Sequence, residues 1–242
     1  MSSFVVSASR PTAARGSLAR VQTQLAQPKL SVKARQHVRN VRSARLTVKA
    51  SAATIVKDST QLAQLASMTT LSVDTGDLKI IEELASTGLI TDATTNPLFV
   101  SQAGQNNDPV YAAFVNEAVE YAKGKASGDE AVALAIDRLA VNLGREIVKL
   151  VPGYVSTEVD PRLSWDFEES LFRARRIIAM YEEAGVPKER VLIKLAGTWE
   201  GIKAAEVLEK EGVTCNITLV FGFAQAVAAA QAGGPPISPV PR

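Results

Sequence analysis

Lys194 stands in the middle of the short apolar run 191–196, which reads VLIKLA. Burial disfavours the charged form of a lysine and lowers its pKa, so an enclosed lysine can supply a neutral amine. A neutral amine attacks a ketone and forms a Schiff base, whose iminium draws electrons from the adjacent carbon–carbon bond. Taken alone, such a lysine is more often a strand-end residue whose ammonium reaches solvent. Other residues must therefore decide whether Lys194 is a catalytic amine or a strand-end residue that reaches solvent.

Carboxylates, amides and hydroxyls stand near the ends of other β-prone segments. Each has a plainer explanation: Asp74 could form a turn, Asn96 before a proline could begin a helix, and Glu158 could be a solvated loop residue. Placed together, two carboxylates can move protons during aldol cleavage without a metal. The candidates are Lys194, Asp74 and Glu158 as catalytic groups, with Asn96, Asn216 and Thr218 as their polar partners.

The segments that carry these residues alternate between strand-like and helix-like patterns. Strands are expected over 69–74, 89–95, 154–159, 191–196 and 214–221. Helices are expected over 77–84, 109–125, 129–149, 166–184, 199–211 and 223–232. Strands that alternate with helices form a parallel sheet, which predicts the α/β class and a TIM-type (β/α) barrel.

In a parallel barrel the carboxyl ends of all strands open on one face, where active sites lie. Side chains alternate along a strand, so Leu192, Lys194 and Ala196 share one side. An ammonium pressed under the helices would be desolvated and unpaired. We therefore expect Lys194 to face the lumen, near the carboxylates.

Residue counts exclude several kinds of chemistry. The single cysteine, Cys215, cannot form an internal disulfide, a CxxC motif or a cysteine zinc cluster. The single histidine, His37, lies in a segment that we expect to be removed, which excludes histidine triads and histidine metal ligands in the remainder. Neither common glycine-rich phosphate loop is present, so no nucleotide site is expected.

The first fifty residues differ in composition from the rest. They contain ten Lys or Arg and no Asp or Glu, which leaves 27 − 10 = 17 basic and 25 acidic residues in 51–242. This composition predicts an organelle transit peptide. Its start, MSSFVVSASR, resembles plastid transit peptides more than mitochondrial ones, and 48–50 resembles a V-x-A processing site. The alternative is a basic arm that binds nucleic acid or membrane. A linker with a short helix is expected over 51–68, and no run is long enough to span a bilayer.

Four segments resemble the transaldolase family: VDTGD (73–77), TDATTNP (91–97), LAVNLGREIVKLVPGYVSTEVDPRLS (139–164) and VLIKLAGTWEGIKAAEVLEKEGVTCNITLVFGFAQA (191–226). The resemblance covers about 69–233. It implies a cofactor-free class I aldolase on an α/β barrel, acting in the non-oxidative pentose phosphate pathway. Such enzymes move a dihydroxyacetone unit from sedoheptulose 7-phosphate to glyceraldehyde 3-phosphate.

The resemblance also implies residue roles. Lys194 matches the Schiff-base lysine, Asp74 the acid–base residue at the cleaved bond, and Glu158 the carboxylate that works through a water. Glu158 further favours transaldolase over the related fructose 6-phosphate aldolases, which have glutamine there. Residues matching those that hold the donor are Asn96, Asn216 and Thr218.

The segment 234–242 departs from the family pattern. It reads GPPISPVPR, in which Ser238 matches an active-site serine. Two prolines precede it and cannot donate to a strand ladder, so a sixth strand is doubtful. We expect a C-terminally shortened barrel of five to six strands and a possible homo-oligomer. The alternative function is an inactive form that only binds full-length subunits.

Overall fold

The computed structural model describes residues 60–106, 108–233 and 236–239. Every described residue belongs to the unit Ala52–Arg242. The expected transit segment 1–50 therefore lies outside the described residues. A short helix, α2 (Gln61–Met68), occupies the end of the segment expected to be a linker.

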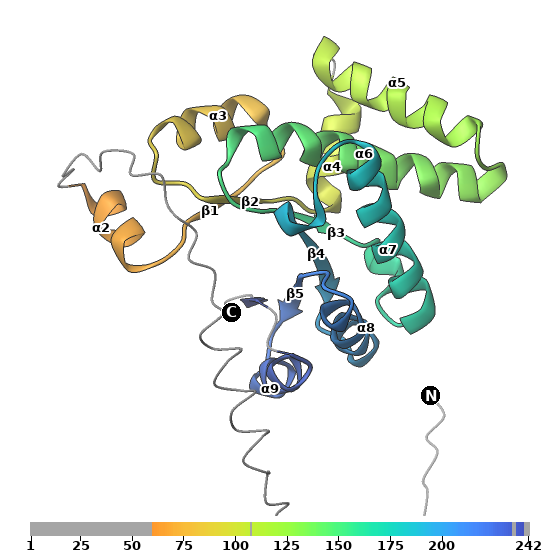
Figure 1. Ribbon diagram of the computed structural model, residues 1–242. Coiled ribbons are helices and arrows are strands. Elements are labelled where there is room, and N and C mark those ends of the chain that lie inside the picture. Colours follow the sequence, from red (N-terminus) through yellow and green to blue (C-terminus); the bar gives the residue numbers. More distant parts are fainter. Residues whose placement is uncertain (1–59, 107, 234–235, 240–242) are drawn as a thin grey trace, which may run out of the picture. The chain divides into compact units, whose positions relative to one another are not determined.

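The described strands form one six-stranded parallel sheet in the order β1 to β6, so each strand pairs with its neighbour in sequence. This order and the intervening helices are those of part of a TIM-type barrel, which confirms the predicted fold class (Figure 1). The strands are β1 (Ser72–Asp74), β2 (Asp92–Thr94), β3 (Val155–Glu158), β4 (Val191–Ala196), β5 (Cys215–Val220) and β6 (Ile237–Pro239).

Helices connect the strands, and most of the predicted ranges are close to the observed ones. The α-helices are α3 (Leu78–Ser86), α4 (Pro97–Gln105), α5 (Pro109–Lys123), α6 (Gly128–Leu150), α7 (Phe167–Glu183), α8 (Trp199–Lys210) and α9 (Phe223–Gln231). Two 3₁₀ turns, η1 (Pro161–Leu163) and η2 (Lys188–Arg190), precede α7 and β4. The helix α4 was not predicted as an element, although its start at Asn96-Pro97 was noted as a possibility.

The sixth strand corrects the expectation drawn from the prolines. A short β6 pairs with β5, and the carbonyl of Pro236 accepts a hydrogen bond of 2.8 Å from the Ile217 amide. A proline lacks only the donor, so it can still serve as an acceptor at the border of a sheet. The pairing is irregular, with a register shift between Ile217 and Val220.

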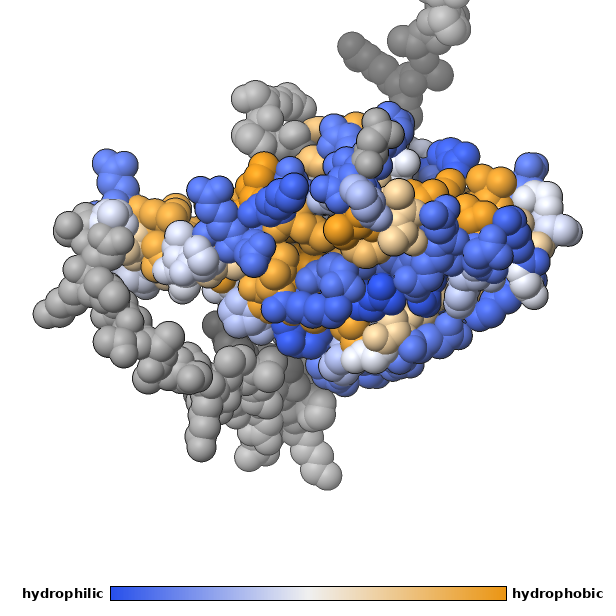
Figure 2. All heavy atoms as spheres, turned by 90° about the horizontal axis from the view of Figure 1, so that it is seen from above, coloured by the Kyte–Doolittle hydropathy of each residue, from blue (hydrophilic) through white to orange (hydrophobic). Residues whose placement is uncertain are grey.

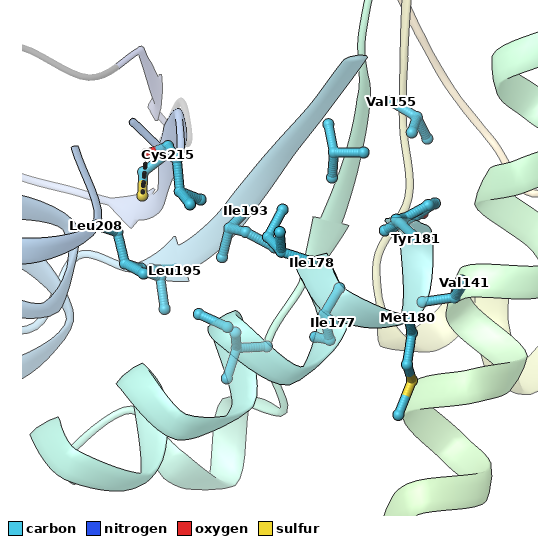
Figure 3. Packing of buried hydrophobic residues seen from close by; sticks show 14 of the residues in the cluster. Val141, Val155, Ile177, Ile178, Met180, Tyr181, Ile193, Leu195, Leu208 and Cys215 are labelled. Carbon is cyan, nitrogen blue, oxygen red and sulfur yellow. Dashed lines mark hydrogen bonds between the residues drawn. The ribbon is translucent and has the colours of Figure 1, made fainter. Parts of the chain in front are cut away.

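The hydrophobic core lies between the sheet and the helices. On β4, Val191, Ile193 and Leu195 belong to this core, whereas the alternate residues Leu192 and Ala196 do not. Figure 3 shows Ile193 and Leu195 among Ile177, Ile178, Leu208 and other core side chains. Lys194 shares the face of Leu192 and Ala196, so the strand presents it to the lumen.

Polar contacts hold β3 and the segment that precedes it within this packing. The buried hydroxyls of Thr157 and Tyr181 lie 2.6 Å apart, linking β3 to α7. The ring passes close to Gly144 on α6, where an added Cβ would overlap the tyrosine hydroxyl. At the amino end of the sheet, Arg190 donates to the carbonyls of Gly153 (2.6 Å) and Val151 (2.8 Å).

Apolar side chains also reach the surface. The face drawn in Figure 2 carries apolar groups between hydrophilic ones. Large exposed apolar side chains of the described unit include Leu98, Trp165 and Phe223. No described helix is long and apolar enough to cross a membrane.

Candidate active site

Strand pairing brings Lys194 beside Glu158. The backbone register places Glu158 of β3 opposite Lys194 of β4, and Lys194 opposite Asn216 of β5. The Lys194 Nζ lies 3.5 Å from Glu158 Oε2, and both side chains are less than 10% exposed, at 9% and 8%. The same Nζ donates to the backbone carbonyl of Thr95 over 3.4 Å. The predicted position of Lys194, enclosed and next to a carboxylate, is what the structure shows.

Burial raises the pKa of the Glu158 carboxyl above its ordinary value. The positive charge of Lys194 opposes this effect and lowers the pKa, while the negative charge of Asp74 raises it further. Burial is the largest of these influences. A carboxyl with a raised pKa holds its proton closer to neutral pH, which suits a group that must both donate and accept.

Asp74 faces the same side of the sheet, but in a different environment. Asp74 pairs in register with Thr94 on β2, and Thr94 pairs in register with Ser156 on β3. Ser156 is two residues from Glu158, so all of these side chains share the lumen face. Asp74 is exposed, because β1 is an edge strand of the described sheet. The two candidate carboxylates therefore differ in solvation.

Asn96 begins a helix, which is the plainer of the roles that the sequence allowed, and it also borders the candidate site. Its Oδ1 caps α4 by accepting from the amides of Leu98 (2.9 Å) and Phe99 (3.2 Å). It also lines a cavity of about 400 Å³ together with Glu158. The remaining walls come from α4, α6 and the segment around η1. Because these two bonds hold Oδ1, the orientation of the Asn96 side-chain amide is fixed.

The other predicted polar residues lie on β5 and β6. Asn216 donates to the Ser156 hydroxyl over 3.5 Å, and Thr218 is buried opposite Ala196. Ser238 follows Ile237, which pairs with Ile217 next to Thr218. The register thus brings Thr218 and Ser238 to adjacent strands, and the side chain of Ser238 lies outside the described part of the chain.

Two residues of the site were missed by the sequence analysis, Thr95 and Ser156. Alternation along 154–159 could have identified Ser156, because it must share the face of Glu158. Thr95 contributes through its backbone carbonyl, which no residue pattern reveals. Among the described residues, no group of three or more His, Cys, Asp or Glu side chains is arranged to hold a metal ion.

Similarity to known proteins agrees with this geometry. Residues 71–240 match the family model for transaldolase/fructose-6-phosphate aldolase. A transaldolase of Marinomonas sp. is 54% identical over 182 residues, 75% of this chain and 56% of that protein. Transaldolases of Aeromonas salmonicida and Vibrio cholerae are 52% and 50% identical, over 74% and 75% of this chain. The chain spans about 55% of the length of these relatives.

The fold and site define an α/β-barrel protein with an enclosed lysine beside a carboxylate at the carboxyl ends of its strands. The chain belongs to the transaldolase/fructose-6-phosphate aldolase family, whose model matches most of it.

Proposed function

We propose that this protein is a transaldolase, which transfers a dihydroxyacetone unit from sedoheptulose 7-phosphate to glyceraldehyde 3-phosphate. The observation that carries the proposal is the enclosed amine of Lys194, 3.5 Å from Glu158 Oε2, in a chain of this family. Both substrates are sugar phosphates, and the reaction uses no cofactor. The resemblance to transaldolases implies that the products are erythrose 4-phosphate and fructose 6-phosphate.

In the first step the neutral amine of Lys194 attacks the C2 carbonyl of the donor and forms a carbinolamine. Loss of the C2 hydroxyl as water then gives the iminium. Glu158, whose pKa is raised by burial, supplies the proton for that water through a bridging water molecule. The site encloses both groups, so the charged intermediate forms away from bulk solvent.

In the second step the C3–C4 bond breaks. Asp74 accepts the proton of the C4 hydroxyl as the electron pair of the bond moves into the iminium, giving an enamine and the first aldehyde. Addition of the enamine to the acceptor aldehyde reverses these movements, and water then releases the new ketose from Lys194. Four residues hold the donor and the bridging water: Asn96, Asn216, Thr218 and Ser238.

The experiment that tests the proposal is borohydride reduction of the full chain in the presence of fructose 6-phosphate. Reduction of the iminium gives a stable secondary amine, which peptide mapping should place on Lys194. Lys194→Met should abolish the adduct, and Lys210→Met, at an exposed lysine of α8, is the matched control. An adduct on another lysine, or none in the wild type, would refute the assignment.

Transaldolase and fructose 6-phosphate aldolase activity differ in the fate of the three-carbon unit. We expect the trapped unit to pass to an added aldose phosphate, with little release of free dihydroxyacetone. Rapid release of dihydroxyacetone without an acceptor would instead favour the aldolase. Glu158 supports the transaldolase, because the resemblance associates glutamine at this position with the aldolases.

We also propose that residues 1–50 direct the protein to the plastid stroma. Their support is compositional: ten basic residues, no acidic ones, and Val48-Lys49-Ala50 before Ser51. A fluorescent protein fused behind these residues should enter chloroplasts. Accumulation in mitochondria or the cytosol would contradict the proposal.

A further inference from the structure

Thr95 joins the end of β2 to β3 through two hydrogen bonds to one acceptor. Its amide and its hydroxyl both donate to the Ser156 carbonyl, over 3.0 and 2.9 Å. The residue is 1% exposed, so neither bond competes with solvent. A buried donor pair of this kind holds the Thr94–Thr95 peptide and the Thr95 side chain in one orientation.

The Thr95 carbonyl belongs to the next peptide, between Thr95 and Asn96, so the residues held on both sides of that peptide limit where the carbonyl points. The carbonyl accepts a hydrogen bond from Lys194 Nζ at 3.4 Å, while Glu158 Oε2 lies 3.5 Å from the same nitrogen. The next residue, Asn96, caps α4, so the following peptide is also held. Lys194 Nζ thus lies between the carbonyl oxygen of Thr95, which follows β2, and a carboxylate oxygen of Glu158 on β3.

We infer that Thr95 is a positioning residue for the Schiff-base lysine. Its hydroxyl donates a hydrogen bond to the Ser156 carbonyl and thereby restrains the Thr95 carbonyl. The Thr95 carbonyl in turn keeps the Lys194 amine aligned with Glu158. The inference rests on the proposed function for its catalytic consequence. The placement of Lys194 itself can be measured independently of activity.

Two substitutions separate the hydroxyl from the shape of the side chain. Thr95→Val keeps the branched shape and the amide but loses the hydroxyl, and Thr95→Ser keeps the hydroxyl. Thr157→Val is the matched control, because it removes a buried hydroxyl bond on the same sheet that faces the helices instead. Melting by circular dichroism identifies any variant that does not fold, and all measurements are made well below each midpoint.

The first measurement is labelling of Lys194 in the full chain by trace acetic anhydride, followed by peptide mapping. We expect Thr95→Val to label Lys194 severalfold faster, because the amine is no longer held against the Thr95 carbonyl and is freer to reach the reagent. Thr95→Ser should stay much closer to the wild type than the valine variant. Thr157→Val should leave the labelling of Lys194 unchanged even if its melting temperature falls.

The second measurement is the rate of the borohydride-trapped adduct with fructose 6-phosphate. A misplaced amine should form it about 10- to 100-fold more slowly in Thr95→Val. Equal labelling and equal trapping in Thr95→Val and wild type would overturn the inference, as would the same changes in Thr157→Val. If the wild type forms no adduct, the proposed function fails, and the labelling comparison still decides the role of Thr95.

Discussion

At the scale of single residues, the pH dependence of stability should reveal the burial of Glu158. Its pKa is raised in the folded state, so its contribution to stability is fully present below the unfolded value, about 4.3, and is lost as pH rises through the folded value. We expect the melting temperature of Glu158→Gln, relative to the wild type, to increase as pH rises from 4 toward neutrality. A constant difference across this range would contradict the raised pKa.

Replacing Asp74 or Glu158 by its neutral amide should slow different steps of the proposed reaction. Asp74→Asn should still form the trapped adduct but transfer the three-carbon unit about 10²- to 10⁴-fold more slowly, the usual loss for a general acid–base group. Trapping and transfer are measured on the same preparation.

Asp77→Asn provides the control for this prediction. Asp77 loses the same charge close to Asp74, but its side chain caps α3, and asparagine caps a helix equally well. Normal transfer in Asp77→Asn together with impaired transfer in Asp74→Asn locates the effect at the site. Equal losses in both variants would indicate a general effect of charge.

At the scale of elements, the packing of α6 against α7 should be sensitive to one methyl group. In Gly144→Ala the new Cβ would overlap the Tyr181 hydroxyl, which must move away from Thr157. We expect a loss of about 1–3 kcal/mol in the free energy of unfolding, measured with urea. Gly124→Ala, with no heavy atom near the added Cβ and a helical backbone, should change stability little.

Prediction from sequence succeeded where a pattern is local. The run 191–196 is a strand in full, because it is short and almost continuously apolar, as expected for a parallel strand that is buried on both faces. The sequence pattern does not predict the helix α4, because its nine residues include polar and glycine positions that weaken the apolar periodicity. A short helix is set largely by its cap and by packing, which tertiary structure supplies.

The sequence predicted which side chains would lie together at the strand ends, but it did not predict the contact that the backbone makes. The contact between Lys194 and Thr95 joins residues 99 positions apart, through a carbonyl that every residue possesses. Only the folded sheet identifies which carbonyl is used. The sixth strand was doubted for a related reason: prolines were judged by the donor that they lack, although the pairing uses an acceptor.

At the scale of the whole molecule, the sheet of the described unit has two edge strands, β1 and β6. Edge strands offer unpaired backbone groups to other chains, and charged side chains reduce this tendency. Ile237 on β6 is 39% exposed, so Ile237→Lys should lower concentration-dependent association, measured by light scattering after size exclusion.

Val227→Lys is the matched control for this change. Val227 is 37% exposed and lies on α9, so Val227→Lys adds the same charge away from the sheet edge. A reduction in association by Ile237→Lys alone would identify β6 as the contact. The same reduction by both variants would point to net charge instead.

The position of Asp74 on an edge strand has a consequence for reaction conditions. Mobile ions screen a charge that faces water, whereas a charge enclosed in protein is screened much less. Added salt should therefore weaken the effect by which the charge of Asp74 raises the pKa of Glu158, while leaving the pairing of Lys194 with Glu158 nearly intact.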